Sequence, residues 1–370
     1  MDQPKWSRLE AAMQRRELGA LVAFSKENVA YGVSYVVPSQ AYGIRNRQFA
    51  FIADSDGNAS FLLSSNELRE AEKRSAVEDL RPYDEFADDP MTALADLLIE
   101  RGVAGERIGI ELDALPADRW EALKRRLPKA DWIAAAPVLD EARSVKTPAE
   151  LELLRRAAHV AELAQAEAHE KAREGMTEQD VGRFIVDAAL KHGADTVLPV
   201  QVAAGERSSY SNPAAGPNPL RHGDVVKIDV SLSVSGYYSD TGRAIVVGEA
   251  SSGQREIWAR MHETLATVHE ALRPGEPASR VWQTFVDSGK RFGMPPAIRF
   301  LGHGLGLALH EEPFIAAHSE DVLQAGMVLS VEPIYQDGDI GYHLEDTVVI
   351  TDNGVENLTS RFSRDLVVVR

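Results

Sequence analysis

Two aspartates lie in a stretch whose other residues are typical of a buried β-hairpin. The runs on either side of Ser235-Gly236 are apolar and β-branched, and this dipeptide suits a tight turn between antiparallel strands. Asp is depleted from strands. With a two-residue turn, Asp229 faces Gly242 and Asp240 faces Ser231, so the two carboxylates lie diagonally on one face, roughly 7–8 Å apart at the backbone. Carboxylates this close raise each other's pKa unless a cation lies between them. The hairpin therefore predicts half of a metal site.

Three more places put ionisable side chains among apolar residues or glycines. His303 and His310 flank a glycine-rich segment, and they are too far apart to share one helical face. A lone histidine is more often structural, but two beside other misplaced acids favour a site. Glu332 closes an apolar strand before a proline, where an unpaired buried carboxylate would be costly. Glu345 and Asp346 point to opposite faces of the next strand, so at most one enters a site, and we choose Glu345.

These misplaced residues share the chemistry of metal ligands. The predicted ligand set is Asp229, Asp240, His303, Glu332 and Glu345. Four carboxylates and one imidazole suit two divalent cations about 3.5–4 Å apart, which can activate a water and polarise a carbonyl. The chain has no cysteine, so thiolate ligands, disulfides and a cysteine nucleophile are excluded. Manganese, cobalt or zinc fits this ligand set better than copper does.

The elements that position these residues alternate between helical and strand patterns. Helices are expected at 147–173, 177–192, 253–272 and 279–292. The Asp337-Gly338 turn predicts that 327–332 and 342–350 form a second hairpin. Helix pairs that alternate with antiparallel hairpins indicate an α+β fold rather than a parallel doubly wound sheet.

The region before these elements contains no concentrated ligand set. Its expected helices are 6–18, 66–77, 90–101 and 116–127. Its expected strands are 20–24, 48–52, 59–63, 108–110 and 132–134, with a turn at Asp56-Gly57. This pattern predicts a smaller α/β domain.

Length and charge limit the class of protein. A chain of 370 residues predicts two domains, and a capping box from Thr147 to Glu150 marks a strong helix start just after the boundary. We expect domains at 1–142 and 143–370. The formal charge of −17 argues against nucleic acid or an anionic membrane as a partner. The N-terminal segment has no apolar signal region and no run approaches the ~18 residues of a membrane span. We expect a cytoplasmic protein.

The motifs resemble those of one known family. IDVSLSVSGYYSDTGR, GHGLGLALHE, SVEP and HLEDTVVIT follow, in order, the motifs of the pita-bread metallopeptidases of family M24, which include aminopeptidase P, prolidase, methionine aminopeptidase and creatinase. The resemblance covers nearly the whole chain. It implies a creatinase-type N-terminal domain at 1–142 and a pita-bread catalytic domain at 143–370.

The resemblance also implies a role for each predicted ligand. By position, Asp229 would chelate one metal ion, Asp240 and Glu345 would bridge two ions, and His303 and Glu332 would bind the second ion. The intact ligand set, together with the N-terminal domain, favours a hydrolase of Xaa-Pro bonds, either a dipeptidase or an aminopeptidase P.

The resemblance implies two catalytic residues. Glu332 would also shuttle the proton of the metal-bound water, whose hydroxide would attack the scissile carbonyl, since a carboxylate beside that water can relay its proton. His310 would contact the substrate carbonyl or the reaction intermediate. Family members commonly form homodimers through the N-terminal domain.

The surroundings of the ligands depart from the family pattern. Asn212 and His343 stand where the family usually carries a substrate-side histidine and an arginine. Asn212 can donate a hydrogen bond but cannot protonate a leaving group. Arg299 stands where a histidine is frequent, and Phe314 stands where some prolidases carry an arginine for the substrate carboxylate.

A dipeptidase needs a cation for the free carboxylate of its substrate. Arg45 and Arg47, in a polar loop of the N-terminal domain, and Arg299 are candidates. With Asn212 and His343 they complete the predicted substrate-binding residues. If the two loop arginines reach a site, we expect it to be that of the partner subunit in a homodimer.

Two other classes of function stay open. The substitutions at Asn212 and His343 also fit a non-peptidase pita-bread hydrolase or lyase that acts on a small cyclic or amidine-like compound. A non-enzymatic scaffold is the third class, but members recruited for binding usually lose ligands, and all five positions are intact here.

Overall fold

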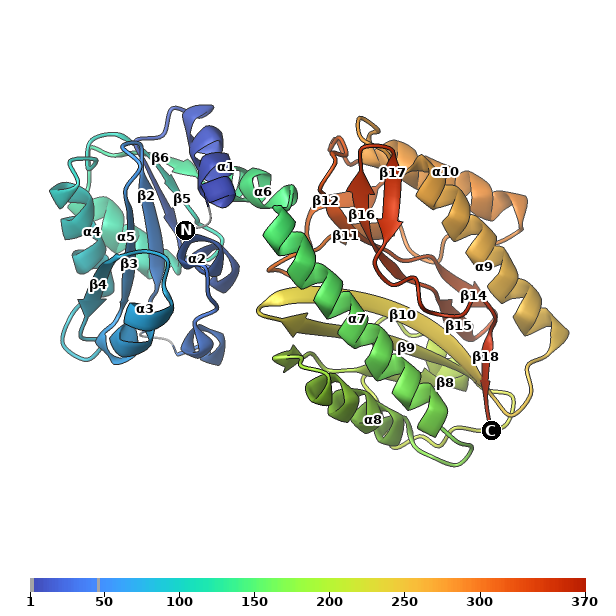
Figure 1. Cartoon of the computed structure of the whole chain (residues 1–370). Helices are drawn as coiled ribbons and strands as arrows, with labels where there is room; N and C mark the ends of the chain where they lie inside the picture. Colours follow the sequence, from blue (N-terminus) through green and yellow to red (C-terminus); the bar gives the residue numbers. More distant parts are fainter. Residues whose placement is uncertain (1–2, 45–46) are drawn as a thin grey trace. The chain divides into compact units, whose positions relative to one another are not determined.

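The computed structural model describes residues 3–44 and 47–370. The chain divides into two compact units, Met1–Arg143 and Ser144–Arg370, shown in blue to green and in green to red in Figure 1. The ionisable residues of the candidate metal site all belong to the second unit.

The N-terminal unit is built on a mixed six-stranded sheet with the order β4-β3-β2-β1-β5-β6. The strands are β1 (Ala20–Ala23), β2 (Ala50–Asp54), β3 (Ala59–Ser64), β4 (Asp79–Tyr83), β5 (Arg107–Ile110) and β6 (Asp131–Ala134). Strand β2 runs antiparallel to both β1 and β3, while the pairs β1–β5, β3–β4 and β5–β6 are parallel. The predicted β2–β3 hairpin is confirmed, and Gly57 in its turn adopts φ 87°.

Helices pack against this sheet over an apolar core from β1, β2, β5 and α4. The helices of the unit are α1 (Gln3–Gln14), α2 (Lys26–Val33), α3 (Leu68–Arg74), α4 (Pro90–Glu100), α5 (Ala117–Arg126) and α6 (Ala136–Ser144), with 3₁₀ turns η1 (Pro38–Tyr42) and η2 (Ser65–Glu67). The α/β character expected for this region is confirmed, but α2, β4 and α6 were not predicted.

The C-terminal unit contains two five-stranded sheets and a short ribbon. The first sheet has the order β18-β10-β9-β7, with β8 also paired to β9, and the second has the order β12-β11-β13-β16-β17. The strands of the first sheet are β7 (Thr196–Val197), β8 (Gln201–Ala204), β9 (Val225–Val234), β10 (Tyr237–Val247) and β18 (Val367–Val369). Those of the second are β11 (Phe300–Gly304), β12 (Glu311–Ala316), β13 (Val328–Val331), β16 (Asp346–Thr351) and β17 (Gly354–Asn357). The ribbon pairs β14 (Ile334–Asp337) with β15 (Ile340–His343), and a 3₁₀ turn, η3 (Gly205–Ser209), follows β8.

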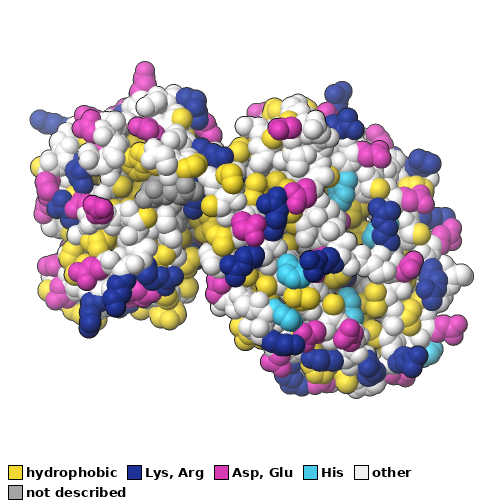
Figure 2. Space-filling model, in the orientation of Figure 1, with side chains coloured by type: hydrophobic (Ala, Val, Ile, Leu, Met, Phe, Trp, Pro, Cys, Tyr) yellow, Lys and Arg dark blue, Asp and Glu magenta, His cyan; other side chains and the backbone are white. Residues whose placement is uncertain are grey.

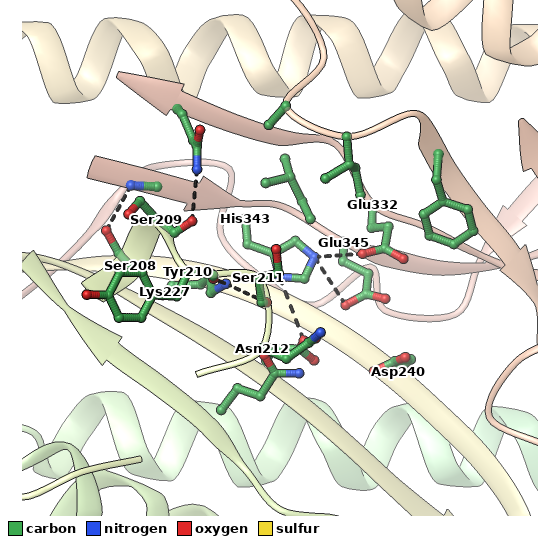
Figure 3. A pocket seen from close by; sticks show the side chains of 18 of the residues that line it. Ser208, Ser209, Tyr210, Ser211, Asn212, Lys227, Asp240, Glu332, His343 and Glu345 are labelled. Carbon is green, nitrogen blue, oxygen red and sulfur yellow. Dashed lines mark hydrogen bonds and ion pairs between the residues drawn. The ribbon is translucent and has the colours of Figure 1, made fainter. Parts of the chain in front are cut away.

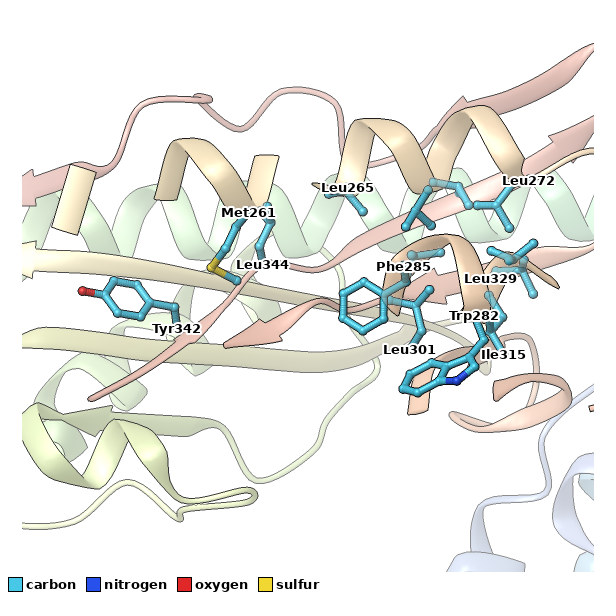
Figure 4. Packing of buried hydrophobic residues seen from close by; sticks show 14 of the residues in the cluster. Met261, Leu265, Leu272, Trp282, Phe285, Leu301, Ile315, Leu329, Tyr342 and Leu344 are labelled. Atoms are coloured by element: carbon cyan, nitrogen blue, oxygen red, sulfur yellow. The ribbon is translucent and has the colours of Figure 1, made fainter. Parts of the chain in front are cut away.

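Two helix pairs cover these sheets, as the sequence predicted. They are α7 (Pro148–Lys171), α8 (Glu178–Lys191), α9 (Ser252–Ala271) and α10 (Ala278–Arg291). Helices α7 and α8 pack on β8, β9 and β10 through one apolar cluster (Figure 1). Helices α9 and α10 pack through a second cluster that reaches β11, β13 and β16 and includes Trp282, Phe285 and Leu329 (Figure 4).

The two halves of the unit repeat one arrangement. Glycines with positive φ hold matching places at both ends of the second helix of each pair: Gly175 (φ 83°) and Gly193 (φ 99°) around α8, and Gly275 (φ 88°) and Gly293 (φ 70°) around α10. Positive φ favours glycine, because other side chains clash there. Each half therefore presents a helix pair followed by antiparallel strands.

The hairpin of β9 and β10 has the predicted register. Val234 pairs with Tyr237, Ser231 with Asp240 and Asp229 with Gly242. Ser235 and Gly236 both have positive φ, 52° and 80°, which is the backbone of a type I′ turn. The carboxylate of Asp195 accepts hydrogen bonds from both turn amides, at 2.7 and 2.9 Å. A two-residue loop therefore puts both aspartates on one face.

The second predicted hairpin is only partly right. Strand β13 pairs with β16, and Val331 lies opposite Asp346. The turn after Asp337 instead closes the separate ribbon of β14 and β15. Proline at position 333 has no N–H for the ladder, so the long hairpin is interrupted between Val331 and Ile334 on one strand and between His343 and Asp346 on the other. Glu332 and Glu345 occupy the interruption.

Charged side chains of both signs are interspersed over the face shown in Figure 2. Within residues 3–44 and 47–370, no helix combines the length and the apolar character that crossing a lipid bilayer requires.

Candidate metal centre

A cavity of about 350 Å³ lies in the C-terminal unit beside the two aspartates of the first hairpin. All five predicted ligands lie at this place, four of them in the cavity wall and His303 directly behind it. His310, Asn212 and His343 also line it. The structure thus brings together residues that are more than a hundred positions apart in the sequence (Figure 3).

The aspartates enter from the first sheet. Asp240 lies on β10 and is 5% exposed, and its Oδ1 accepts a hydrogen bond from Ser231 Oγ at 2.8 Å. Asp229 lies on β9, two residues before Ser231 on the same face, and its side chain is 15% exposed. Apart from the bond to Ser231, the Asp240 carboxylate lies among other acids and an imidazole.

His303 enters from β11 of the second sheet and is fully buried. Its Nδ1 lies 2.9 Å from the carbonyl oxygen of Gly304, and a carbonyl only accepts, so Nδ1 carries the proton. This leaves a lone pair on Nε2, which has no hydrogen-bond partner in the structure. Nε2 lies 3.7 Å from Asp240 Oδ2 and 3.8 Å from Glu332 Oε1. An imidazole held by a carbonyl at one nitrogen and free at the other is arranged as metal-binding histidines are.

Glu332 and Glu345 enter where the second hairpin is interrupted. The backbone amide of Glu332 donates to Leu301 O at 2.7 Å, and that of Glu345 donates to Gly242 O at 2.9 Å. The second of these bonds joins the two sheets. Ser330 Oγ donates to Glu345 Oε1, whereas Glu345 Oε2 is buried without a partner. Freed from the strand ladder, both carboxylates point into the cluster (Figure 3).

Three groups of side chains each bring their ligand atoms within 4.8 Å of one another. They are Asp229 with Asp240 and Glu345, His303 with Glu332 and Glu345, and Asp240 with His303 and His310. Asp240, His303 and Glu345 each belong to two of these groups. Of these three, only the two carboxylates have two oxygen atoms that could be shared between cations.

Burial and mutual repulsion raise the pKa values of the clustered carboxyl groups. Burial raises the pKa of Asp240 well above its ordinary value, and the charges of Asp229 and Glu332 raise it further. Burial and the charge of Asp240 do the same to the pKa of Glu345. Burial also raises the pKa of Asp229, and it raises that of Glu332 to about 7. Buried acids of one sign are stable only if they are protonated or paired with positive charge.

The donor set and the unsatisfied atoms fit divalent metal ions. Carboxylate oxygens and one free imidazole nitrogen suit manganese, cobalt or zinc. The buried Glu345 Oε2 and His303 Nε2 both lack a partner that a bound ion would supply.

His310 lies against the cluster at the cavity wall. Its ring stacks on that of His303, with 3.7 Å between the ring centroids, and on Phe300 at 6.3 Å. Burial lowers the pKa of His310 below its ordinary value, which favours a neutral ring. A neutral imidazole at this position can donate one hydrogen bond to a ligand in the cavity.

His343 is buried among the candidate ligands. It is 2% exposed, its Nε2 lies 3.4 Å from Glu332 Oε2 and 3.6 Å from Glu345 Oε2, and its Nδ1 lies 4.0 Å from Asp229 Oδ2 (Figure 3). A methyl group on Gly242 would come within 2.6 Å of the His343 ring, so only glycine leaves room for it. His343 therefore fills the space between three of the carboxylates.

The structure separates the other predicted substrate-binding residues. Asn212 is exposed at the cavity wall. Arg299 and Phe314 line a different cavity, with Trp282 and His318, and not the one that holds the cluster. Arg299 is therefore not placed beside the candidate ligands.

The loop arginines belong to the N-terminal unit. Arg47 pairs with Glu85 at 2.6 Å and with Glu67 at 2.8 Å, and its side chain is 13% exposed. Two carboxylates of its own unit therefore satisfy its guanidinium. Arg45 lies outside the residues that the structure describes.

Lys227 is a cavity residue that the sequence interpretation missed. It precedes Asp229 by two residues on β9, so strand alternation puts it on the same face. It is 2% exposed, and burial lowers its pKa. The signal in the sequence was this same alternation, Lys227, Asp229, Ser231, which places a third polar side chain beside the two that were noticed.

Behind the cluster, Asp346 forms a separate buried pair. Its Oδ1 accepts from Arg243 Nη2 at 2.6 Å, and its Oδ2 accepts from Asn357 at 2.6 Å. Arg243 also donates to the backbone carbonyl of Glu345. Asp346 thus faces away from the cavity and fixes the backbone that carries Glu345.

Comparison with known proteins identifies the family. Residues 152–352 match the model of metallopeptidase family M24, and residues 5–145 match that of the creatinase/prolidase N-terminal domain. The chain belongs to metallopeptidase family M24. The resemblance seen in the sequence motifs and the α+β pita-bread fold with a smaller N-terminal α/β domain are both confirmed.

Relatives within family M24 resemble the chain along most of its length. It is 34% identical to a Xaa-Pro dipeptidase of Pyrococcus furiosus over 69% of this chain and 74% of that relative. It is 30% identical to a probable dipeptidase PepE of Mycobacterium tuberculosis over 92% of this chain and 90% of that relative. The crystal structure of the prolidase from Pyrococcus horikoshii superimposes with a TM-score of 0.85 at 26% identity, covering 98% of this chain and 99% of that one.

Proposed function

We propose that this M24 protein is a dinuclear metal-dependent Xaa-Pro dipeptidase. The observation that carries the proposal is the convergence of four carboxylates and the free Nε2 of His303 on one cavity of about 350 Å³. A cavity of this size is at the lower end of the range for small-molecule sites. The relatives named Xaa-Pro dipeptidase support the substrate class, since they match the chain across both domains.

The five ligands would hold two ions, with Glu345 and Asp240 shared between them. Asp229 would complete one ion's ligands, and His303 and Glu332 would complete those of the other. When bound, the ions would polarise the scissile carbonyl and lower the pKa of a coordinated water. Manganese, cobalt and zinc are the metals that we propose.

Glu332 would accept a proton from the attacking water. Its carboxylate belongs to the ligand group with His303 and Glu345, and burial raises its pKa to about 7, close to neutral pH. A carboxylate of this kind can accept a proton at one step and return it at the next. It would deliver that proton to the proline nitrogen as the peptide bond breaks.

The cavity wall would orient the peptide. His310 would donate a hydrogen bond to the substrate carbonyl oxygen, where negative charge develops. Asn212, exposed in the wall, would donate to a backbone group of the substrate. His343 lines the cavity, is 2% exposed, and would position the carboxylates of Glu332 and Glu345.

Hydrolysis of matched peptides tests the function. We expect the protein, after removal of metal and reconstitution with Mn²⁺, Co²⁺ or Zn²⁺, to cleave Xaa-Pro and to leave Xaa-Ala nearly untouched. We expect Xaa-Pro-Xaa to be cleaved at least tenfold more slowly, and metal analysis to give about two ions per chain. No turnover of any Xaa-Pro peptide by protein that holds two ions would refute the proposal.

The position of His343 also supports a second candidate function. His343 fills the space among three carboxylates where prolidases and aminopeptidases P usually carry an arginine, so the shape and charge of the site differ from theirs. A metal-dependent hydrolase or lyase for a small cyclic or amidine-like compound is the alternative. Turnover of such compounds by metal-loaded protein that is inert toward Xaa-Pro peptides would favour it.

The homodimer and the cytoplasmic location stay predictions.

Arg45 and Arg47 would bind a substrate only in a partner subunit's site, and Arg47 is already paired within its own unit. Arg47→Ala would shift the preference between Xaa-Pro and Xaa-Pro-amide if it has this role. An unchanged preference would exclude it.

A further inference from the structure

No polar contact fixes the direction of the His310 ring. Within residues 3–44 and 47–370 the ring stacks on His303 and Phe300, but neither of its nitrogens forms a hydrogen bond or an ion pair. A group that acts on a substrate must nevertheless come within hydrogen-bond reach of the reacting atoms. The position of His310 therefore depends on the backbone that carries it.

That backbone ends a loop that packs on the side chain of Glu311. The loop, residues 305–310, joins β11 to β12, and the carbonyl of Gly306 accepts a hydrogen bond from the amide of Tyr238 on β10 at 2.8 Å. The Glu311 carboxylate lies directly against Gly306, since a methyl group there would come within 2.5 Å of Glu311 Oε1. Glu311 is 8% exposed and lies opposite Gly304 in the pairing of β12 with β11. The carboxylate therefore supports the loop from inside the fold.

Lys146 holds this carboxylate in place. Its Nζ lies 2.5 Å from Glu311 Oε1 and donates to the carbonyl of Ser144 at 3.1 Å. Both charged side chains are buried, with 2% of the lysine and 6% of the glutamate exposed. The backbone amide of Lys146 donates to Gly326 O at 2.9 Å, and the next residue, Thr147, is the N-cap of α7. Since the backbone of the lysine is anchored as well, the charge-assisted bond fixes where the Glu311 carboxylate lies.

We propose that Lys146 is a positioning residue for His310 and acts through Glu311. The inference rests on the proposed function, because it concerns the histidine of that same site. Glu311 directly follows His310, so a shift of its carboxylate would change where β12 begins and where the His310 ring lies. Neither Lys146 nor Glu311 is among the described residues that line the cavity, so an effect on catalysis must be indirect. A misplacement of about 1 Å in a reacting group can cost roughly 10²-fold in rate.

A double-mutant cycle with His310→Gln tests the inference. Lys146→Met removes the ammonium and keeps a side chain of similar shape. We expect it to lower kcat for Xaa-Pro roughly 10- to 100-fold in metal-loaded protein and to change KM less than about threefold. In the His310→Gln background the same change should lower kcat by less than about twofold, because a histidine that is absent cannot be misplaced. The melting temperature should fall equally in both backgrounds.

Metal content and thermal unfolding are measured on each variant, and rates are taken at a temperature where all variants are folded. Tyr237→Phe is the matched control. It removes a buried hydrogen bond at the start of the same helix, from Tyr237 Oη to Glu150 Oε1 at 2.9 Å. It should lower the melting temperature and leave kcat close to that of wild type. If Lys146→Met does not fold, Glu311→Gln, which keeps an oxygen acceptor for Nζ, takes its place in the cycle.

Two results would overturn the inference. One is a loss of kcat by the same factor with and without His310, which would mean that the ion pair only stabilises the fold. The other is a wild-type kcat in the variant that breaks the pair. Wild type that holds metal but cleaves no Xaa-Pro peptide would instead refute the proposed function, so the two failures are distinguishable.

Discussion

Replacing Asp240 by asparagine should stabilise the metal-free protein while it abolishes metal binding. Asp240 lies within 4.8 Å of the ligand atoms of both Asp229 and Glu345. At that distance and an effective dielectric constant of about 20, two ionised carboxylates repel by roughly 3–4 kcal/mol. Burial and the charges of Asp229 and Glu332 raise the pKa of Asp240, which lowers its tendency to ionise, so the realised gain is smaller. We expect apo Asp240→Asn to be more stable than the apo wild type by about 1–3 kcal/mol at pH 7.5.

The sign of the pH dependence follows from the raised pKa values. The folded-state pKa of Asp240 and that of Glu332, at about 7, lie above their unfolded values. Their contribution to stability is therefore fully present below about pH 4 and is lost as the pH rises through the folded-state pKa. The advantage of Asp240→Asn should be small at pH 5 and should grow up to pH 7.5.

Calorimetry of chelator-treated protein measures the effect. For a unit of this size the gain corresponds to a rise of about 3–9 °C in the melting temperature. With excess Mn²⁺ the order should reverse, because ligand binding stabilises only the protein that keeps its ligands. The matched control is Asp346→Asn. Asp346 pairs with buried Arg243, so its loss should destabilise the protein with and without metal by about 3–5 kcal/mol.

A metal-free Asp240→Asn protein that is less stable than wild type at pH 7.5 would refute the electrostatic interpretation of the cluster. So would an advantage that is the same at pH 5 and pH 7.5, since repulsion between ionised groups must vanish when they are protonated.

Three further predictions concern single residues. Glu332→Gln should lower kcat for Xaa-Pro by about 10²–10⁴-fold, because the amide cannot relay a proton, and steady-state kinetics at saturating metal measures this. Gly242→Ala should displace the His343 ring, because a Cβ would approach it to 2.6 Å. We expect the free energy of unfolding to fall by about 1–3 kcal/mol and the affinity for Mn²⁺ to fall as well. An unchanged Mn²⁺ affinity in isothermal titration would contradict this prediction. Burial lowers the pKa of His262 to about 4, so its contribution to stability is full above about pH 6.5 and is lost as the pH falls toward 4. In urea unfolding, the free energy of unfolding should therefore fall less between pH 7 and pH 5 in His262→Gln than in wild type.

Local rules are enough to predict the first hairpin. A two-residue turn and a side-chain period of two determine every cross-strand pair, so the sequence by itself places Asp229 and Asp240 on one face. The choice of Glu345 over Asp346 follows from the same alternation, and the structure places Glu345 in the cavity wall and Asp346 against Arg243.

Features that depend on distant partners could not be predicted. The interruption at Glu332 and Glu345 depends on how two strands meet around a proline, and the sequence pattern alone suggests one continuous hairpin. Arg299 was expected near the site because of its position in the chain, but the direction of the irregular segment before β11 has no periodic signal. Lys227 was not predicted because a lysine in a strand usually faces solvent, and its burial depends on the loop at 210–211 that covers it.

The placement of the candidate ligands on two different sheets has a mechanical consequence. Asp229 and Asp240 belong to the first sheet, His303 belongs to the second, and Glu332 and Glu345 lie next to strands β13 and β16 of the second. Ions held between them would act as cross-links between the two halves, which also share an apolar cluster that includes Ala244 and Val246 of β10. Part of the free energy of metal binding would then stabilise the association of the two halves. Removal of the metal by a chelator should first weaken the contacts between the two halves. Amide hydrogen exchange should then accelerate along β10 and β16, while the amides of the helix pairs stay protected.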